Sequence, residues 1–318
     1  GLVGSEMCIR DRMKIVNKES RFVEEASKET QVNMMKERRK AWEGNRAVKG
    51  VGSTNTWKKG GYGHIEDSKP DDCVRILLEN YNNLQYFTDE KVRRKINTID
   101  STRRRLKADV IAGVETGVDW TIAQREGMNT FHDLFGMSED KKSVCAHNKT
   151  EQNMKSQPGG TCIMAYGVFS SYIKAPSEDL HQGKDKRGLG SYCSLVTTGM
   201  SGNSVRLVVY YRPNDESRRG APRKGRQTVF AQHMREFKRK QMHNCDPRLE
   251  ADRCLLEDIR TWRSQGEEIV LLGDYNQNIY TSELAIALSQ PDIGMSEQYS
   301  KLHGEQAPHS HISGSKRP

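Results

Sequence analysis

Short apolar runs recur along residues 74–272, and segments with helical periodicity separate several of them. The runs with strand character are Val74–Leu78, Asp109–Val114, Pro158–Tyr166 (a turn leading into a strand), Tyr192–Thr198, Val205–Tyr211 and Glu268–Leu272. The segments in which apolar residues return every three to four positions are Asp89–Lys107, Gln227–Met242 and Arg248–Trp262. A chain with both periodicities must build sheets and helices around a shared core.

The order of these elements narrows the fold class. Strands alternate irregularly with helices, and the turn Gly199–Asn203 joins two strands as a hairpin. This pattern favours two sheets packed together with helices outside over a doubly wound parallel sheet. We therefore predict an α+β fold, a two-sheet β-sandwich flanked by helices in four α/β/β/α layers.

The chain divides into three parts. Residues 1–12 (GLVGSEMCIRDR) resemble a translated sequencing-library adapter, so we leave them out of the fold prediction. Residues 13–70 are polar and charged, with a glycine-rich stretch at Gly50–Gly63, and we predict a disordered N-terminal region. Within it, Ser20–Trp42 keeps partial helical spacing. Residues 71–318 are predicted to form the folded domain.

The charge balance bears on partners. The chain has 51 Lys and Arg against 42 Asp and Glu, a net charge of +9. An excess of this size favours polyanionic partners, although a well-solvated surface explains it as well. The basic stretch Ser217–Arg226 is the densest candidate contact. No apolar run is long enough to span a bilayer, so no membrane partner is predicted.

The seven cysteines form no CxxC pair, so neither a zinc ribbon nor a thioredoxin motif is supported. We interpret them as structural residues. Scattered reduced thiols are typical of an intracellular protein, and a DNA partner would favour the nucleus.

Polar residues follow the predicted strands where the strands end. These residues are Asn80, Glu115, Tyr211, Arg212, Asn214, Asp274 and Asn276. Strand ends converge at one rim of a sheet, where a carboxylate can bind Mg²⁺ and a second can orient or deprotonate a water. Amide and phenol groups can stabilise charge that develops on a phosphoryl oxygen. Each residue alone is also consistent with a structural role: a solvated loop carboxylate, a turn-forming Asn, or a core Tyr.

The order of these residues resembles that of the endonuclease/exonuclease/phosphatase superfamily. Asn80 resembles the Asn that ends the family's first strand, and Val114-Glu115-Thr116 resembles its Gln-Glu-Thr, with Val in place of Gln. Tyr210-Tyr211-Arg-Pro-Asn214 is similar to Tyr-x-Pro-Asn, and Gly273-Asp274-Tyr-Asn276 to Gly-Asp-Phe-Asn. The last block is the most specific match. The spacing most resembles endonuclease domains of retroelements that carry a reverse transcriptase.

The resemblance implies a role for each residue. Glu115 and Asn80 would bind Mg²⁺, for which Mn²⁺ can substitute, and Asp274 would act on the attacking water. Tyr211, Asn276 and Asn80 would serve catalysis, while Asn214 and Arg212 would bind substrate. Two family motifs that follow in relatives, Ser-x-x-x-Ile-Asp and Ser-Asp-His, have no counterpart before Pro318. We therefore expect a domain that is incomplete at its C-terminus and nearly inactive, and we do not assign His309 or His311 to the missing His.

The predicted function is metal-dependent phosphodiester hydrolysis in nucleic acid, with DNA favoured over RNA. Two alternatives remain open. One is a phosphatase or ribonuclease of the same fold, since fold alone does not determine substrate. The other is a basic nucleic-acid-binding module without catalysis, which would use Arg218, Arg219, Arg223, Lys224 and Arg226. The sequence does not indicate an oligomeric state.

Overall fold

The structure is a computed structural model of the 318-residue chain. It describes residues 5–8, 69, 73–84, 89–118, 123, 133, 141–148, 157–174, 185–199, 202–214, 228–242, 245–277 and 282–298. The predicted helix at Ser20–Trp42, the basic stretch Ser217–Arg226, His309 and His311 lie outside these ranges.

The first sheet has five strands in the order β1-β2-β3-β5-β4. Its strands are β1 (Ser5–Cys8), β2 (Arg75–Asn80), β3 (Val110–Val114), β4 (Lys141–Ala146) and β5 (Thr161–Tyr166). β2 and β3 are parallel, whereas the other neighbours are antiparallel. The crossover between the parallel pair contains helix α2 (Glu90–Leu106).

The second sheet has three strands in the order β6-β7-β8. They are β6 (Tyr192–Thr198), β7 (Ser204–Tyr211) and β8 (Glu268–Asp274), with the short helix α5 (Gly167–Ser171) following β5. The predicted hairpin is present, because β6 and β7 are antiparallel. β7 and β8 are parallel, and their crossover contains α6 (Val229–Arg239) and α7 (Pro247–Ser264), while α8 (Glu283–Leu288) follows β8.

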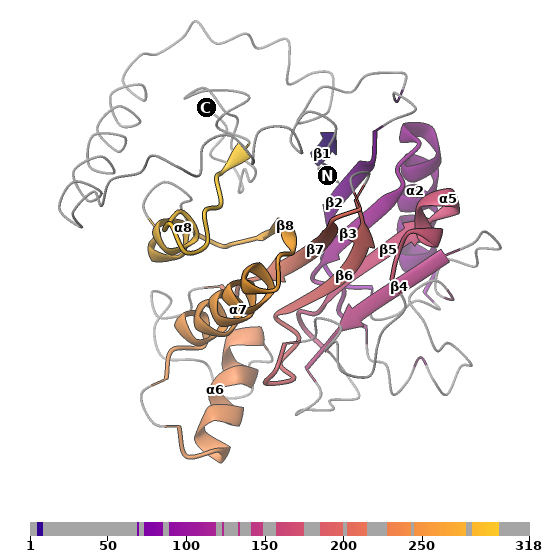
Figure 1. The fold of residues 1–318 in the computed structure, drawn as a ribbon. Helices are drawn as coiled ribbons and strands as arrows, with labels where there is room; N and C mark the ends of the chain where they lie inside the picture. Colours follow the sequence, from indigo (N-terminus) through magenta and orange to yellow (C-terminus); the bar gives the residue numbers. More distant parts are fainter. Residues whose placement is uncertain are drawn as a thin grey trace, which may run out of the picture.

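The two sheets pack face to face, with α2 outside the first sheet and α6 and α7 outside the second, so the fold has four layers (Figure 1). Three apolar clusters fill the spaces between these layers. The cluster between the sheets includes Ile76, Val114 and Ile163 from one and Leu207 and Val209 from the other. The outer clusters join α2 to the first sheet and α7 to the second. The α+β fold class and its α/β/β/α layering are therefore as predicted.

Side-chain caps determine where the main helices begin. Asp89 accepts from Lys91 N before α2, Thr228 accepts from Ala231 N before α6, and Asp246 accepts from Arg248 N before α7. Such caps satisfy backbone donors that have no partner within the helix. At the end of α2, Lys107 is left-handed at φ 49°, and the last turn is basic.

A buried ion pair links β7 to the segment before β8. Arg206, 1% exposed, donates from Nε to Glu267 Oε2 at 2.5 Å and from Nη2 to Oε1 at 2.8 Å. The guanidinium carbon also lies 4.4 Å from the centre of the Trp262 ring on α7. The pair is thus desolvated and stacked, which makes each partner dependent on the other.

Four elements were not expected from the sequence: β1, β4, α5 and α8. β1 lies within the residues left out of the prediction, yet its backbone pairs with β2. Lys69, which we placed in the N-terminal region, also contacts the domain, because its Nζ lies 2.6 Å from Asp109 Oδ1. No helix among the described residues is long and apolar enough to span a membrane. The free thiols are those of Cys73, Cys145, Cys162, Cys193, Cys245 and Cys254.

Candidate active site at the ends of β2, β3, β7 and β8

Both parallel strand pairs end at the same rim of the sandwich. In the first sheet Asn80 pairs with Val114, and Glu115 follows directly. In the second sheet Tyr211 pairs with Asp274. Since β2 packs against β8 and β3 against β7, the residues at these ends face one another across the seam between the sheets.

Asn80 lies between the two carboxylates of this rim. Its Nδ2 donates to Asp274 Oδ2 at 3.2 Å, and its side chain also hydrogen-bonds to Glu115. Its Oδ1 accepts from the backbone N–H of Asn82 at 2.8 Å. The amide therefore presents N–H groups to both carboxylates. For Asn80 Oδ1 to ligate a metal beside Glu115, as the sequence suggested, the amide would have to flip and lose its bond to Asn82.

Burial raises the pKa of Glu115, and the negative charge of Asp274 raises it further. Hydrogen bonds from Tyr211 and Asn80 and the positive charge of Lys95 oppose this rise. Glu115 is half-buried, whereas Tyr211 is 4% exposed and packs in the core between the sheets. Because Asp274 disfavours the charged form of Glu115, a divalent cation bound between the two carboxylates would stabilise the site.

Two site residues have left-handed backbone, Glu115 at φ 52° and Asn276 at φ 46°. This conformation costs a residue other than glycine roughly 1–3 kcal/mol, and it persists where surrounding contacts impose it. At Glu115 the carbonyl accepts from Asn83 N at 2.9 Å. At Asn276 the backbone N–H donates to Asp274 Oδ1 at 3.2 Å, and Nδ2 donates to the Arg212 carbonyl at 2.6 Å.

Arg212, predicted to bind substrate, has its side chain elsewhere. Arg212 is 5% exposed, and its guanidinium donates from Nε to Asp252 on α7 at 2.9 Å, with Nη2 also 2.9 Å from that carboxylate. Tyr210 donates to the same Asp252 at 2.6 Å. Alternate side chains at the end of β7, Tyr210 and Arg212, are turned toward α7. The Arg212 backbone still serves the rim through its carbonyl. Asn214 is exposed beyond the strand end.

Two residues beside this rim were missed by sequence reasoning, Glu79 and Lys95. Glu79 on β2 is 3% exposed, its Oε2 has no hydrogen-bond partner in the described part of the chain, and burial raises its pKa to about 7. Lys95 on α2 is half-buried, and burial lowers its pKa, while Glu115 and Glu79 oppose that change. In the sequence, Lys95 is one of many basic residues in a helix, so nothing distinguished it.

Position 113 of β3 requires glycine because the side chain of Tyr81 packs against it. A Cβ on Gly113 would lie 2.1 Å from the Tyr81 ring. The ring therefore packs directly against Gly113, and the segment after β2 can approach the end of β3 closely. Its backbone bonds, Tyr81 N to the Val114 carbonyl and Leu84 N to the Thr116 carbonyl, continue the pairing beyond the strands.

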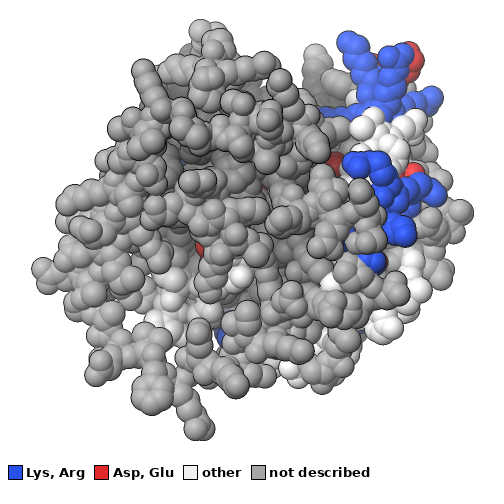
Figure 2. Space-filling model, turned by 90° about the horizontal axis from the view of Figure 1, so that it is seen from above, with Lys and Arg blue, Asp and Glu red and all other residues white. Residues whose placement is uncertain are grey.

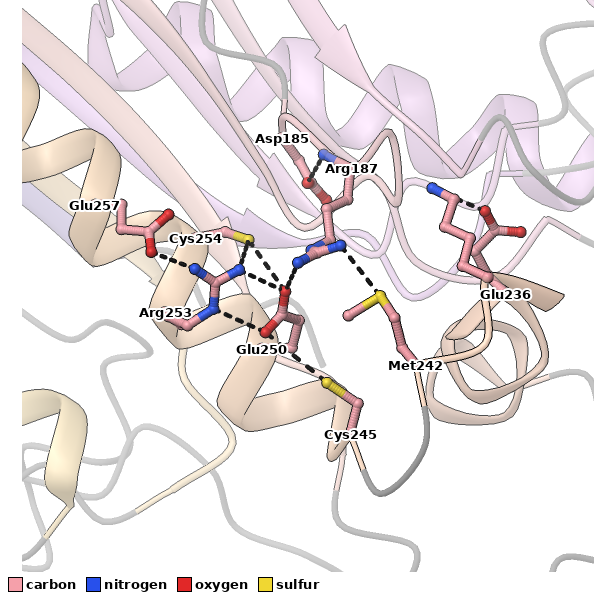
Figure 3. Close-up of polar contacts among 10 residues, drawn as sticks. Asp185, Arg187, Glu236, Met242, Cys245, Glu250, Arg253, Cys254 and Glu257 are labelled. Atoms are coloured by element: carbon pink, nitrogen blue, oxygen red, sulfur yellow. Dashed lines mark hydrogen bonds and ion pairs between the residues drawn. The ribbon is translucent and has the colours of Figure 1, made fainter. Parts of the chain in front are cut away.

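A second feature on the same rim is a pocket between the end of β4 and the loop before β6. It has a volume of about 280 Å³ and is lined by His147, Asp185, Lys186 and Arg187 among others. Both cations bind carboxylates of α7, Lys186 binding Asp258 and Arg187 binding Glu250. Figure 3 shows Glu250 at the centre of this network, with Arg187 and Arg253 on either side and the two thiols of Cys245 and Cys254 nearby. We assign no ligand to this pocket.

The donor set of the rim fits a hard divalent ion. Mg²⁺ is bound in proteins by one or two carboxylates together with water and substrate phosphates, and Glu115 and Asp274 provide two carboxylates. Within the described ranges no cluster of three or more His, Cys, Asp or Glu side chains could hold a metal. Two carboxylates leave the remaining positions around such an ion to water and substrate oxygens.

Comparison with known proteins gives no match to a protein-family model and none to a curated protein. Among solved structures, the chain is similar to the human Nocturnin catalytic domain with bound sulfate (TM-score 0.45, 13% identity, 74% of this chain and 77% of that one). It is also similar to two structures of TDP2 from C. elegans. One has a TM-score of 0.32 at 13% identity, covering 62% of this chain and 48% of that one. The other has a TM-score of 0.34 at 12% identity, covering 85% and 73%. At these values the assignment of function depends on the geometry of the site itself.

Proposed function

We propose that this chain is a metal-dependent phosphodiesterase of the endonuclease/exonuclease/phosphatase superfamily that hydrolyses phosphodiester bonds in nucleic acid. The observation that carries the proposal is the meeting of Glu115 and Asp274, one from each sheet, with the Asn80 amide between them. Like charges at half-buried positions are unfavourable alone and become favourable when they share a cation.

The site residues divide the chemistry among themselves. Glu115 and Asp274 would hold Mg²⁺ or Mn²⁺. The bound ion would neutralise negative charge on the phosphoryl oxygens. Asp274 would orient the attacking water and accept its proton. Tyr211 would orient Glu115 through its hydrogen bond. The second amide N–H of Asn276, together with the exposed Asn214, would donate to phosphoryl oxygens as charge develops on them. In its observed orientation, Asn80 hydrogen-bonds to both carboxylates and so fixes their relative position.

The charge distribution supports nucleic acid as the partner. Residues 90–107 contain eight Lys and Arg against two acidic residues, so this segment accounts for +6 of the chain's net +9. Lys91, Arg93, Arg94, Arg104, Arg105 and Lys107 are exposed. Figure 2 shows lysine and arginine gathered on the right of this view, the side on which α2 lies in Figure 1. A phosphate backbone would release counterions on binding such a surface.

Among nucleic acids we favour DNA as the substrate. The motif spacing described above also favours an endonuclease domain of a retroelement-like protein. A ribonuclease or phosphatase would use the same groups on another phosphoryl substrate. The basic surface of α2 also supports a second candidate, a nucleic-acid-binding module without turnover. Salt-sensitive DNA affinity that survives Glu115→Ala, with no cleavage under any divalent ion, would favour that candidate.

The test combines metal binding with cleavage. Mn²⁺ affinity is measured by electron paramagnetic resonance for the unaltered chain, Glu115→Gln and Asp274→Asn. Cleavage of supercoiled plasmid and of single-stranded RNA is measured with the protein in excess, so that slow turnover is detected. We expect Mn²⁺ to bind at least tenfold more weakly to each variant, and any Mg²⁺-dependent nicking to be lost in both.

The exposed Asp292→Asn is the matched control, because its carboxylate pairs with Arg260 on the surface. We expect that variant to bind Mn²⁺ as the unaltered chain does. Affinity unchanged in Glu115→Gln and Asp274→Asn, or cleavage that persists in both, would contradict the proposed function.

A further inference from the structure

The segment that follows β2 has an unusual backbone. Asn82 and Asn83 are both left-handed, at φ 41° and φ 72°. Asn tolerates this conformation better than most residues, but two in succession still need support from their surroundings. A side chain of α2 contacts the carbonyl groups of this segment.

Lys95 of α2 contacts three successive carbonyls of this segment. Its Nζ donates to the carbonyl of Tyr81, lies 3.1 Å from that of Asn82 and 3.5 Å from that of Asn83. A lysine ammonium has three N–H donors, so its donor number matches the three acceptors. The lysine therefore fixes where each of these peptide groups points.

Two of these three peptide groups contact the candidate site through their N–H side. Asn82 N donates to Asn80 Oδ1 at 2.8 Å, which turns the Asn80 Nδ2 toward Asp274. Asn83 N donates to the Glu115 carbonyl at 2.9 Å, where the Glu115 backbone is left-handed. Two of the site residues thus take their orientation from peptides whose carbonyls Lys95 holds.

We propose that Lys95 is a positioning residue that orients Glu115 and Asn80 for divalent-metal binding by holding the peptide groups of residues 81–83. The proposal rests on the proposed function, because it assigns Lys95 a role in that same site. Lys95 does not touch the reacting atoms. It acts through the segment between β2 and α2.

An electrostatic role for Lys95 would have the opposite effect on metal affinity. Lys95 is a cation near Glu115, and its charge therefore opposes the binding of a second cation there. Loss of that charge alone would tighten metal binding. Loss of the positioning contacts would weaken it, so the sign of the change separates the two roles.

The experiment compares Lys95→Met with Lys91→Met in the full chain, with Mn²⁺ affinity as the readout. Lys91 is exposed one helical turn away, so its replacement removes the same charge without touching residues 81–83. We expect Lys95→Met to bind Mn²⁺ about tenfold more weakly and Lys91→Met to bind it as tightly as before or slightly more tightly. Methylammonium added to Lys95→Ala, which leaves room for it, should restore part of the lost affinity.

Equal or tighter Mn²⁺ binding by Lys95→Met would overturn the proposal. If Lys95→Met does not fold, Lys95→Gln replaces it, since the glutamine amide can still donate two hydrogen bonds to the same carbonyls. Intermediate affinity in Lys95→Gln would support the proposal, and unaltered affinity would overturn it. Failure of the unaltered chain to bind Mn²⁺ would instead contradict the proposed function.

Discussion

Asn80 donates its amide N–H to Asp274 at 3.2 Å, although 194 residues separate the two in the chain. The bond joins the end of β2 in one sheet to the end of β8 in the other. It is also the contact that keeps a neutral donor between two carboxylates. Replacing Asn80 with aspartate adds a third carboxylate, and its effect measures directly how strongly the site attracts a cation.

Asn80→Asp should lower stability without metal and increase the stabilisation by Mn²⁺. A carboxylate at this distance from Asp274 adds repulsion on the order of 2 kcal/mol in the metal-free protein. The same repulsion is relieved when a cation binds, so the rise in Tm between EDTA and Mn²⁺ should exceed that of the unaltered chain. Asn80→Ala is the control and should show no increase. A smaller Mn²⁺ response in Asn80→Asp would contradict this view of the site.

Glu79→Gln should stabilise the protein at neutral and alkaline pH. The folded-state pKa of Glu79 is raised from 4.5 to about 7, so folding favours the protonated form. Stability is therefore intact below about pH 4.5 and decreases as pH rises toward 7, by up to about 3 kcal/mol. Urea unfolding in EDTA at pH 4.5 and pH 8 measures this difference.

Glu79→Gln should then show a flatter pH dependence, with its gain confined to pH 8. The exposed Glu283→Gln serves as the control and should follow the unaltered chain at both pH values. An equal gain at both pH values would indicate a packing effect of the amide rather than relief of a buried charge.

Arg212→Met should destabilise the fold rather than weaken phosphate contacts. Asp252, which is 6% exposed, would keep its carboxylate buried and lose its ion pair, which costs about 3–5 kcal/mol. Chemical unfolding measures the loss. The salt dependence of DNA binding, measured below the unfolding transition, should keep its slope, because the guanidinium faces α7. A reduced slope would indicate that Arg212 contacts the substrate phosphates, as predicted from the sequence.

The double variant Arg93→Gln/Arg105→Gln should weaken nucleic-acid binding and reduce its salt dependence. Each lysine or arginine that contacts a phosphate contributes about one unit to the slope of log affinity against log salt. Fluorescence anisotropy with a short duplex at several salt concentrations gives that slope. Arg260→Gln/Arg263→Gln on α7 removes the same charge elsewhere and should leave it unchanged. Equal effects of the two double variants would mean that net charge, not the α2 surface, determines binding.

The layered fold was predictable because its central strands are mostly apolar and buried on both faces. β3 is buried along its whole length, and β7 is buried at every residue but the first. β4 (Lys141–Ala146) escaped prediction because it begins with two lysines and forms a sheet edge, where no continuous apolar run is needed. α8 has only six residues, too few for a periodic pattern to emerge.

The candidate site was predictable to the extent that it lies at strand ends. Glu115 and Asp274 were each named from their position after an apolar strand, and the structure brings them together. The direction of each side chain was not predictable. Arg212 belongs to the motif by sequence, but strand alternation and Asp252 on a distant helix decide where it points. Lys95 was not found because its contacts are with carbonyl groups, which every sequence contains.

The two sheets build the rim in the same way, each from a parallel pair whose crossover helices cover its outer face. One pair ends in Asn80 and Glu115, the other in Tyr211 and Asp274. If the two halves were made as separate polypeptides, each would carry only one of the two carboxylates. Bound metal would then report reassembly of the halves, and the chain is in this sense a natural candidate for a split-protein sensor.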